Sequence, residues 1–511
     1  MNKIIYSNSD CCDNSHKRIL YIRIALISIL TCIIIHSFTG EMIPYHDGLG
    51  WDGVAFFRII RDFHNLFFSH GIDQYYMSRF FPFAVIHYAL RLCSIPITIE
   101  SALIGAKIFN GFMLILLIVY FYKMSLLLKW NIQTEIVAFS FVFFNFPVLK
   151  LFGYYPIATD CTALLLAYAG VFYYLSNNLY KLVAVGLIAL LTFPFVSVVL
   201  LILTLFPRNF VEPITKNSED SFSKCFSFIV RFLFCITPLL LFMLRVYLHR
   251  LDVSQMFITI RGYSGYVVSC ISLLAVVSFY YLSTFPLIIN WRQLFASIFL
   301  KSHFLKILIG ICCFFLLYKL LSFVGSPTVR FNLYSQFVGM HVYSQSDIFI
   351  FLETPFLYLG LFPLLVMLSW FHIFEFVKKE FGVGYFLVVI LFLIMVMDIE
   401  TRKLVAFYPV LLVPLINYIQ SITLKKQVVF VIPFVCLLTS FFWFNINTPD
   451  IKNAFEQSIP TYVNFPAQRY FMFFGPWQSH SVYLVTIFIE ILLGSLIYVL
   501  YKRGMLTNRN V

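Results

Sequence analysis

Long apolar runs separated by short polar turns recur along almost the whole chain, and they limit what it can fold into. Runs such as residues 19–38, 102–122 and 305–323 reach the roughly 20 residues that an α-helix needs to cross a bilayer. Spanning strands would need alternating segments of ~10 residues, which the sequence lacks. Charged residues make up only 12% of the chain, against about 25% in soluble domains. We therefore predict an all-α, polytopic membrane protein with about 12–14 spans.

Basic residues lie at alternate connections between the predicted spans. The spans cover approximately residues 19–38, 102–122, 132–148, 161–175, 182–206 (two short helices broken at Thr192 to Pro194), 228–247, 267–289, 305–323, 348–371, 383–397, 405–419, 428–444 and 482–501. Because Lys and Arg are enriched in cytoplasmic loops, Lys17-Arg18 and Lys502-Arg503 place both termini in the cytoplasm.

The formal net charge is +13, from 36 Lys and Arg against 23 Asp and Glu. In a soluble protein this excess would favour a nucleic-acid partner. Here the basic residues flank apolar runs, so topology anchoring explains them and we expect no nucleic-acid partner. The 11 cysteines show no metal-ligand or disulfide spacing and are expected to be buried thiols.

The chain divides into three predicted regions. Residues 1–18 form a cytoplasmic tail, residues 19–206 a transmembrane module that contains the polar loop 40–100, and residues 207–511 a variable set of transmembrane helices with extracytoplasmic loops 325–347 and 445–480. Within the loop, residues 54–68 and 83–93 place apolar side chains at helical spacing with charges between them. That pattern predicts two helices lying at the membrane surface.

Two carboxylates in the first loop, Asp47 and Asp52, are each followed by glycine. A sugar transfer needs a base that takes the proton from the acceptor hydroxyl, and a carboxylate in a partly dry site can do this. The flanking glycines allow tight turns and close approach of a substrate. The alternative is that Asp47-Gly48 and Asp52-Gly53 are ordinary turns, and spacing alone favours this alternative slightly.

Further polar groups gather on the same predicted side of the membrane, at span ends. Tyr155 and Asp160 precede a span, and Asp160 is a second candidate acid or a helix cap. Asp398 begins a charged turn in which Arg402 and Lys403 are candidate phosphate ligands, although a solvated hairpin is the alternative. The remaining candidates for phosphate binding are Arg79 and Arg330, for which snorkelling anchors are the alternative.

No metal site is predicted. His46, His341 and His480 lie in predicted outside loops without metal-ligand spacing to one another. A divalent metal between Asp47 and Asp52 has no sequence support, so the cofactor requirement stays open. Nucleotide-binding and nucleophile-elbow patterns are absent from the sequence, which argues against a nucleotide-driven pump.

Four short motifs occur in a familiar order. They are Asp52-Gly53 followed by Phe56-Phe57-Arg58-Ile59, then Tyr76 to Arg79 and Pro82, then Thr159-Asp160, and finally Asp398 to Arg402 with Tyr408-Pro409. In this order the chain resembles the GT-C superfamily of integral-membrane glycosyltransferases, which includes protein O-mannosyltransferases and lipid A aminoarabinose transferases. The resemblance covers about the first two hundred residues and the turn at Asp398.

The resemblance implies a loop aspartate as general base and a polyprenyl-phosphate sugar as donor. Asp52 is then the first choice as base, with Asp47 and Asp160 assisting, and Arg79 and Arg402 hold the donor phosphate. The resemblance also implies a location in the bacterial inner membrane. The expected partners are a lipid-linked sugar donor, a glycan or lipid acceptor, and membrane lipid. The pattern does not decide between Asp47 and Asp52.

Three alternatives to this transferase remain. One is a structural membrane scaffold, which would make the outside acidic residues dispensable. An O-antigen or capsule polymerase would also join lipid-linked sugars outside the cell. A non-enzymatic flippase or transporter of lipid-linked glycans should carry charges deep within several spans. Most charges here lie at span ends, which favours the enzyme, but Arg245 and Glu490 lie near or within apolar runs and keep the transporter open.

Overall fold

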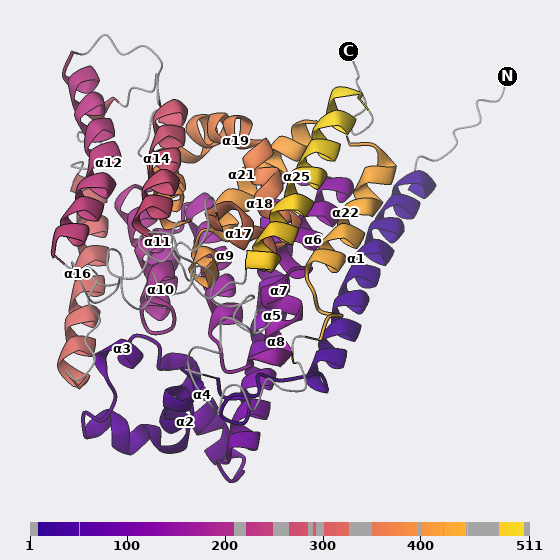
Figure 1. The fold of residues 1–511 in the computed structure, drawn as a ribbon. Coiled ribbons are helices and arrows are strands. Elements are labelled where there is room, and N and C mark those ends of the chain that lie inside the picture. Colours follow the sequence, from indigo (N-terminus) through magenta and orange to yellow (C-terminus); the bar gives the residue numbers. More distant parts are fainter. Residues whose placement is uncertain are drawn as a thin grey trace.

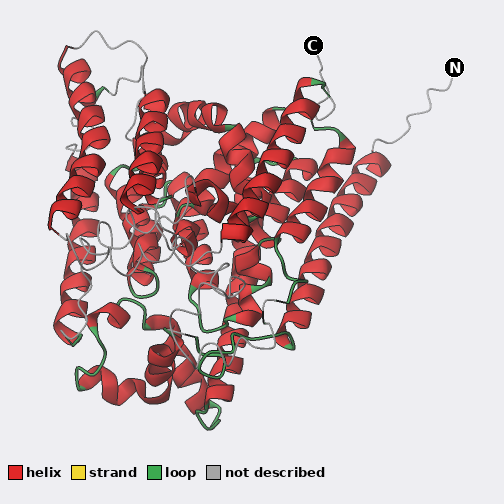
Figure 2. Cartoon of the chain, in the orientation of Figure 1, coloured by secondary structure: helices red, strands yellow, loops and turns green. Residues whose placement is uncertain are grey.

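The computed structural model describes residues 9–50, 52–208, 221–248, 265–284, 290–292, 301–326, 350–396, 401–422, 424–445, 447 and 480–504. In these residues the regular elements are helices alone (Figures 1 and 2), which confirms the predicted all-α class. The longer helices are α1 (Ser9–Phe38), α2 (Gly53–Phe68), α4 (Phe81–Leu92), α5 (Ile99–Leu128), α6 (Ile132–Phe143), α9 (Asp160–Leu175), α10 (Leu179–Leu190), α11 (Pro194–Leu205), α12 (Ser221–Leu248), α14 (Gly265–Thr284), α16 (Lys301–Val324), α17 (Ile350–Leu359), α18 (Leu361–Leu368), α20 (Gly382–Met395), α21 (Tyr408–Ser421), α22 (Lys426–Thr439) and α25 (His480–Lys502).

Short helices connect or extend these elements. They are α3 (Gln74–Met77), α7 (Phe146–Leu149), α8 (Leu151–Tyr154), α19 (Trp370–Phe376), the π-helix η3 (Val377–Phe381) and the 3₁₀-helix η4 (Thr401–Ala406). The helix α1 already begins at Ser9, so the second half of the predicted tail 1–18 is helical.

Several helices are apolar and long enough to cross a membrane, which makes the chain a multi-pass membrane protein. Among the described residues four single helices meet this test, Ile19–Phe38, Ile99–Leu128, Phe304–Val324 and Tyr483–Lys502, and α6 with α7–α8 forms a fifth span bent by 62°. Other predicted spans correspond to apolar helices of 10–17 residues. The count of about 12–14 spans therefore stays a prediction.

The helices α2, α3 and α4 lie across one end of the bundle (Figure 1), and we call this the α2–α4 end. The helix α2 buries Phe56, Ile59, Ile60 and Phe63 at the spacing of an amphipathic helix. The ring nitrogen Nδ1 of buried His87, on α4, lies 2.6 Å from the carbonyl oxygen of Ile60 and fixes the two helices to each other. Both surface helices predicted over residues 54–68 and 83–93 are present as helices.

The predicted break at residues 192–194 is confirmed. The helices α10 and α11 pack against each other on either side of it. The N–H of Phe81 donates to the carbonyl oxygen of Leu191 at 3.1 Å, so the bend touches the α2–α4 end. Each helix has 12 residues, about 18 Å of rise against a hydrocarbon core of about 30 Å. A polar group at this bend can therefore reach below the membrane surface.

The predicted single span 348–371 is instead two helices and the start of a third. The helix α17 ends at Leu359, and Gly360 has φ of +69° before α18 begins. Glycine adopts a positive φ without steric cost because it has no Cβ atom. A Cβ atom at this position would also lie 2.8 Å from the Thr439 hydroxyl. The periodicity of apolar residues could not show this break because every residue around it is apolar.

Candidate functional site

The first loop ends in a tight turn that brings the start of α2 to the ring of Tyr155. The N–H of Gly50 donates to the carbonyl oxygen of Tyr45 at 2.9 Å, and Gly50 has φ of +65°. A side chain at Gly50 would lie 2.6 Å from the Tyr155 ring. Gly50 therefore allows this turn to pack closely against the Tyr155 ring. That packing positions the neighbouring Asp52.

Asp52 immediately precedes α2, and its side chain makes no capping hydrogen bond to that helix. The carboxylate is 27% exposed and lies 3.9 Å from Nη1 of Arg79. The hydroxyl of Tyr76 donates to its other oxygen at 3.5 Å. Short O–H···O bonds measure about 2.5–3.0 Å, so both contacts are loose. The Asp52 carboxylate keeps lone pairs that a substrate hydroxyl can use.

Tyr76 stays protonated beside Asp52. Burial raises the pKa of Tyr76 to about 12, and the negative charge of Asp52 adds to this while Arg79 opposes it. A neutral phenol donates a hydrogen bond to the carboxylate without taking its proton. Tyr76 was not among the predicted site residues. The signal that could have identified it was its position at the start of the short motif that runs through Arg79 to Pro82.

Arg79 is a buried cation at the same place. Its guanidinium lies over the ring of Tyr75 at 4.5 Å and faces the ring of Phe193 at 5.8 Å. Its Nε is buried and has no hydrogen-bond acceptor among the described residues. A buried donor without an acceptor is costly, and an anionic ligand would satisfy it. This geometry fits the phosphate-binding role predicted for Arg79.

Asp160 and Arg402 form a buried ion pair. Nη2 of Arg402 donates to one oxygen of Asp160 at 2.8 Å, and the hydroxyl of Tyr358 donates to the other at 2.6 Å. The Asp160 side chain is only 2% exposed. Asp160 is the first residue of α9, and the N-cap is the residue before it, Thr159, whose side chain makes no capping hydrogen bond. The recorded partners of the Asp160 carboxylate are Arg402 and Tyr358. Tyr358 had no sequence signal because it lies in an unbroken apolar run.

Tyr155 connects the two carboxylates. It lies just beyond α8, and its ring lies against Gly50 and Gly53, where an added side-chain carbon would approach it to 2.6 Å and 3.7 Å. Burial raises the pKa of the Tyr155 phenol, the charges of Asp52 and Asp160 raise it further, and Arg402 opposes them. Tyr155 therefore lies within electrostatic reach of Asp52 on one side and of the Asp160–Arg402 pair on the other. The structure thus brings together residues that are up to 350 positions apart in the numbering.

Lys403 is buried and lies over the ring of Phe195 at 4.8 Å. Phe195 is two residues from Phe193, the ring that Arg79 faces. Two cations from distant segments, Arg79 and Lys403, therefore lie against the start of α11. The helix η4, which carries Arg402 and Lys403, packs against α9, α11, α17, α20 and α21.

An apolar groove begins at the same bend. It has a volume of about 270 Å³ and lies between α10, α11 and α16, lined by Leu190, Pro194, Phe195, Leu201, Phe314 and Tyr318 among others. The side chain of Phe195 lines this groove, and Nζ of Lys403 lies over its ring. We call this space the α11–α16 groove. A molecule with a charged head at Lys403 and an apolar tail fits this arrangement.

Asp47 is not brought into this arrangement. Asp47 is exposed, has φ of +52° in the turn after Tyr45, and makes no hydrogen bond or ion pair that the structure records among its described residues. This is the geometry of a turn residue, as the alternative interpretation proposed. Arg330 and Asp398 lie outside the described residues.

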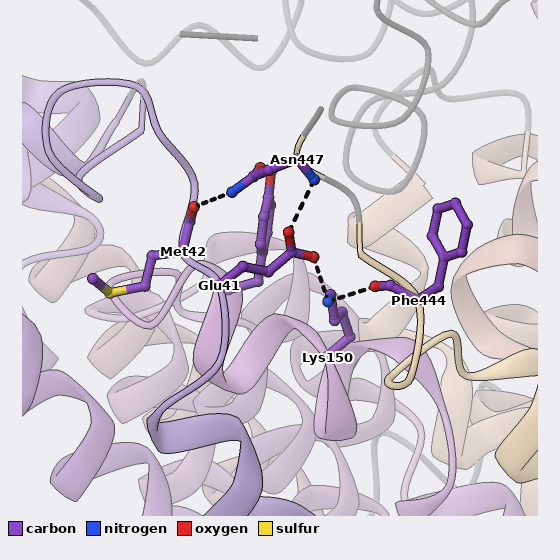
Figure 3. Close-up of polar contacts among 6 residues, drawn as sticks. Glu41, Met42, Lys150, Phe444 and Asn447 are labelled. Carbon is purple, nitrogen blue, oxygen red and sulfur yellow. Dashed lines mark hydrogen bonds and ion pairs between the residues drawn. The ribbon is translucent and has the colours of Figure 1, made fainter. Parts of the chain in front are cut away.

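A second polar network, absent from the sequence predictions, joins the first loop to the C-terminal part of the chain (Figure 3). Nζ of Lys150 donates to Glu41 at 2.6 Å and to the carbonyl oxygen of Phe444 at 2.7 Å. The N–H of Asn447 donates to Glu41 at 2.9 Å, and its side-chain amide donates to the carbonyl oxygen of Met42 at 2.8 Å. We call these residues the Glu41–Lys150 tie. Lys150, a lone lysine inside an apolar run, was the available signal.

In the part of the chain that the structure describes, no group of three or more His, Cys, Asp or Glu side chains is placed to hold a metal ion. Comparison of the chain with protein-family models, with curated proteins and with solved structures finds no match in any of the three. The chemistry of the site must therefore be argued from its own residues.

Proposed function

We propose that this chain is a GT-C-type glycosyltransferase of the bacterial inner membrane. It moves a sugar from a polyprenyl-phosphate donor to a glycan or lipid acceptor outside the cytoplasm. The observation that carries the proposal is the loosely held carboxylate of Asp52 beside the buried guanidinium of Arg79. A base and an anion-binding cation at one place are what this transfer requires.

In the proposed step the acceptor hydroxyl attacks the anomeric carbon of the donor sugar. Asp52 takes the hydroxyl proton, the new C–O bond forms, and the bond between the anomeric carbon and the phosphate oxygen breaks. The electron pair leaves with the phosphate, whose charge Arg79 and Lys403 stabilise. Tyr76 offers Asp52 a long hydrogen bond, Tyr155 packs against the turn that precedes Asp52, and Asp160 orients Arg402.

The α11–α16 groove supports a lipid-linked donor. Its lining is almost entirely apolar, and it leads away from the bend where Lys403 contacts Phe195. A polyprenyl chain is apolar along its whole length and carries its only charge at one end. Placing that chain in the groove puts the phosphate at the cations, with the sugar toward Asp52.

Transport of a lipid-linked glycan is the second candidate. It is favoured by two acidic residues, Glu353 on α17 and Glu490 on α25, that are buried within apolar helices which contact each other. Acidic groups at such depth are costly unless they serve a pathway. A polymerase would share the proposed chemistry and differ only in its acceptor.

The test is a glycan and lipid profile of cells that lack the protein, complemented at matched expression with wild type, Asp52→Asn or Asp47→Asn. We expect Asp52→Asn to lower the transferred sugar by at least about 100-fold, the scale of general-base catalysis. Asp47→Asn is the matched control and should retain most of the product. Full product with Asp52→Asn, together with loss in Glu490→Gln, would replace the enzyme with the transporter.

A further inference from the structure

A second apolar cavity borders η4. It has a volume of about 300 Å³, lies among α14, α17, α18, α20 and α21, and is lined by Ala275, Val276, Leu352, Pro355 and Leu404 among others. It is partly open to the outside of the bundle, where its lining residue Met367 is 45% exposed. We call it the α14–α17 cavity. Its volume is at the lower end of the range for ligand pockets, about 300–1,000 Å³.

The two lining residues that carry a hydrogen-bond donor are already engaged elsewhere. Nε1 of Trp370 donates to the hydroxyl of Ser283 at 2.8 Å. The hydroxyl of Tyr408 donates to the carbonyl oxygen of Phe141. The cavity therefore offers its occupant apolar contact and no polar partner from these side chains, and it suits a hydrocarbon chain.

The cavity can take up an occupant from its surroundings, because its lining residue Met367 is 45% exposed. Apolar cavities exclude water and take up apolar molecules. In a membrane protein the apolar molecules available are lipids, because their chains surround the bundle.

The position of the cavity relates it to the site. Leu404 lines the cavity, and the residue before it, Lys403, lies over Phe195 of the α11–α16 groove. Arg402, one residue further, binds Asp160. One apolar space is thus lined by a residue of η4, and the other is lined by the ring that Lys403 of η4 contacts. A protein or a free glycan as acceptor would need only one such space, the one for the donor chain.

We propose that the acceptor is itself a lipid, and that its hydrocarbon chain occupies the α14–α17 cavity while its headgroup hydroxyl reaches Asp52. This inference rests on the proposed glycosyltransferase function and specifies its acceptor. In the step, the headgroup O–H gives its proton to Asp52 and its oxygen to the anomeric carbon. The donor phosphate leaves with the electron pair.

The experiment uses the full chain in vesicles of phosphatidylethanolamine and phosphatidylglycerol that contain a photoreactive phosphatidylglycerol with a diazirine at the end of an acyl chain. The residues of α17 are buried apart from the half-buried Leu352, so lipid adducts on α17 report entry into the cavity. We compare wild type with Ala275→Phe, which fills the cavity. The matched control is Leu274→Phe, which adds the same ring at the neighbouring exposed position.

We expect adducts on α17 in wild type, at least a tenfold loss in Ala275→Phe, and no loss in Leu274→Phe. In complemented cells, Ala275→Phe should lose the transferred sugar and Leu274→Phe should retain it. Leu352→Trp fills the same cavity from α17. It replaces Ala275→Phe in the test if gel filtration shows that Ala275→Phe is not folded. Absence of adducts on α17 in wild type would overturn the proposal. The proposal would also be overturned if Ala275→Phe lost the α17 adducts but still transferred the sugar fully.

Failure of this inference is distinguishable from failure of the proposed function. Asp52→Asn leaves the cavity intact, so it should keep the α17 adducts while losing transfer. If Asp52→Asn transfers fully, the enzyme is refuted whatever the adducts show. If Asp52→Asn is inactive while the filled cavity still supports transfer, only the lipid acceptor is refuted.

Discussion

Asp52 and Asp160 carry the same functional group in opposite surroundings, and this difference assigns their roles. Asp160 is 2% exposed and has short bonds to Arg402 and Tyr358. Asp52 is 27% exposed and has only long contacts with Arg79 and Tyr76. A carboxylate whose oxygens are both committed serves as a fixed charge, and a loosely held one can accept a proton. Asp160 therefore positions Arg402, and the proton transfer falls to Asp52.

Breaking the buried pair should be far more harmful than removing an exposed cation. Arg402→Met leaves the Asp160 carboxylate buried without its ion-pair partner, and we expect a loss of about 3–5 kcal/mol of unfolding free energy. The double variant Asp160→Leu with Arg402→Met should recover most of that stability but not the activity. Thermal unfolding in detergent measures both. Arg61→Met, which removes an exposed arginine of α2, is the control, and equal stability of Arg402→Met and Arg61→Met would contradict this role.

Tyr76 should act as a permanent hydrogen-bond donor. Its pKa is raised to about 12, chiefly by burial, so the phenol contributes stability below its unfolded pKa near 10 and loses that contribution as pH rises through about 12. Between about pH 6 and pH 9 it does not titrate. Tyr76→Phe should therefore lower transfer by the same factor at every pH in this interval, at unchanged expression. A change in the shape of the pH–rate profile would show that Tyr76 titrates in catalysis.

At the scale of the element, the loop before α2 depends on a glycine that no side chain can replace. Gly50→Ala places a methyl group 2.6 Å from the Tyr155 ring at a φ of +65°, and left-handed backbone costs a non-glycine residue about 1–3 kcal/mol. We expect lower thermal stability and lower transfer, because both Tyr155 and Asp52 are displaced. Gly111→Ala is the matched control, since its new methyl group meets only one atom, at 4.0 Å. A neutral Gly50→Ala would show that the turn has another conformation in the membrane.

The elements that the sequence predicted are those with a local signal. The amphipathic α2 follows from charges at helical spacing, and the break between α10 and α11 follows from Pro194. The break at Gly360 lies in an apolar run, where glycine alone does not distinguish a kink from a continuous membrane helix. The same reason hides Tyr358, whose apolar neighbours give no sign that its hydroxyl meets Asp160.

At the scale of the whole molecule, the sequence placed the polar clusters on one side of the membrane but could not place them against one another. Alternating spans and basic turns indicate which helix ends share a side. They do not show that Arg79 faces Phe193 while Lys403 faces Phe195, because that depends on how α10 and α11 pack beside η4. Nor could they show that Asp47 stays outside this cluster while Asp52, five residues later, enters it.

The Glu41–Lys150 tie joins the start of the first loop to Phe444 and Asn447, and it should matter for the position of Asp52. Lys150→Met removes the ammonium group that pairs with the Glu41 carboxylate, whose side chain is only 15% exposed, and this loss costs about 1–3 kcal/mol. Because residues 41–52 connect the tie to Asp52, we expect faster hydrogen exchange over residues 41–50 and reduced transfer. Lys181→Met, which removes an exposed lysine of α10, should change neither.

A combined variant separates the tie from the charge itself. In Glu41→Gln with Lys150→Met the buried carboxylate is gone, so the stability should return toward wild type. The link to the Phe444 carbonyl stays broken, however, so the loop should still exchange faster and transfer should stay low. If the combined variant instead regains full transfer, the tie serves only to neutralise Glu41, and the loop holds Asp52 in place through Gly50 and Tyr155 alone.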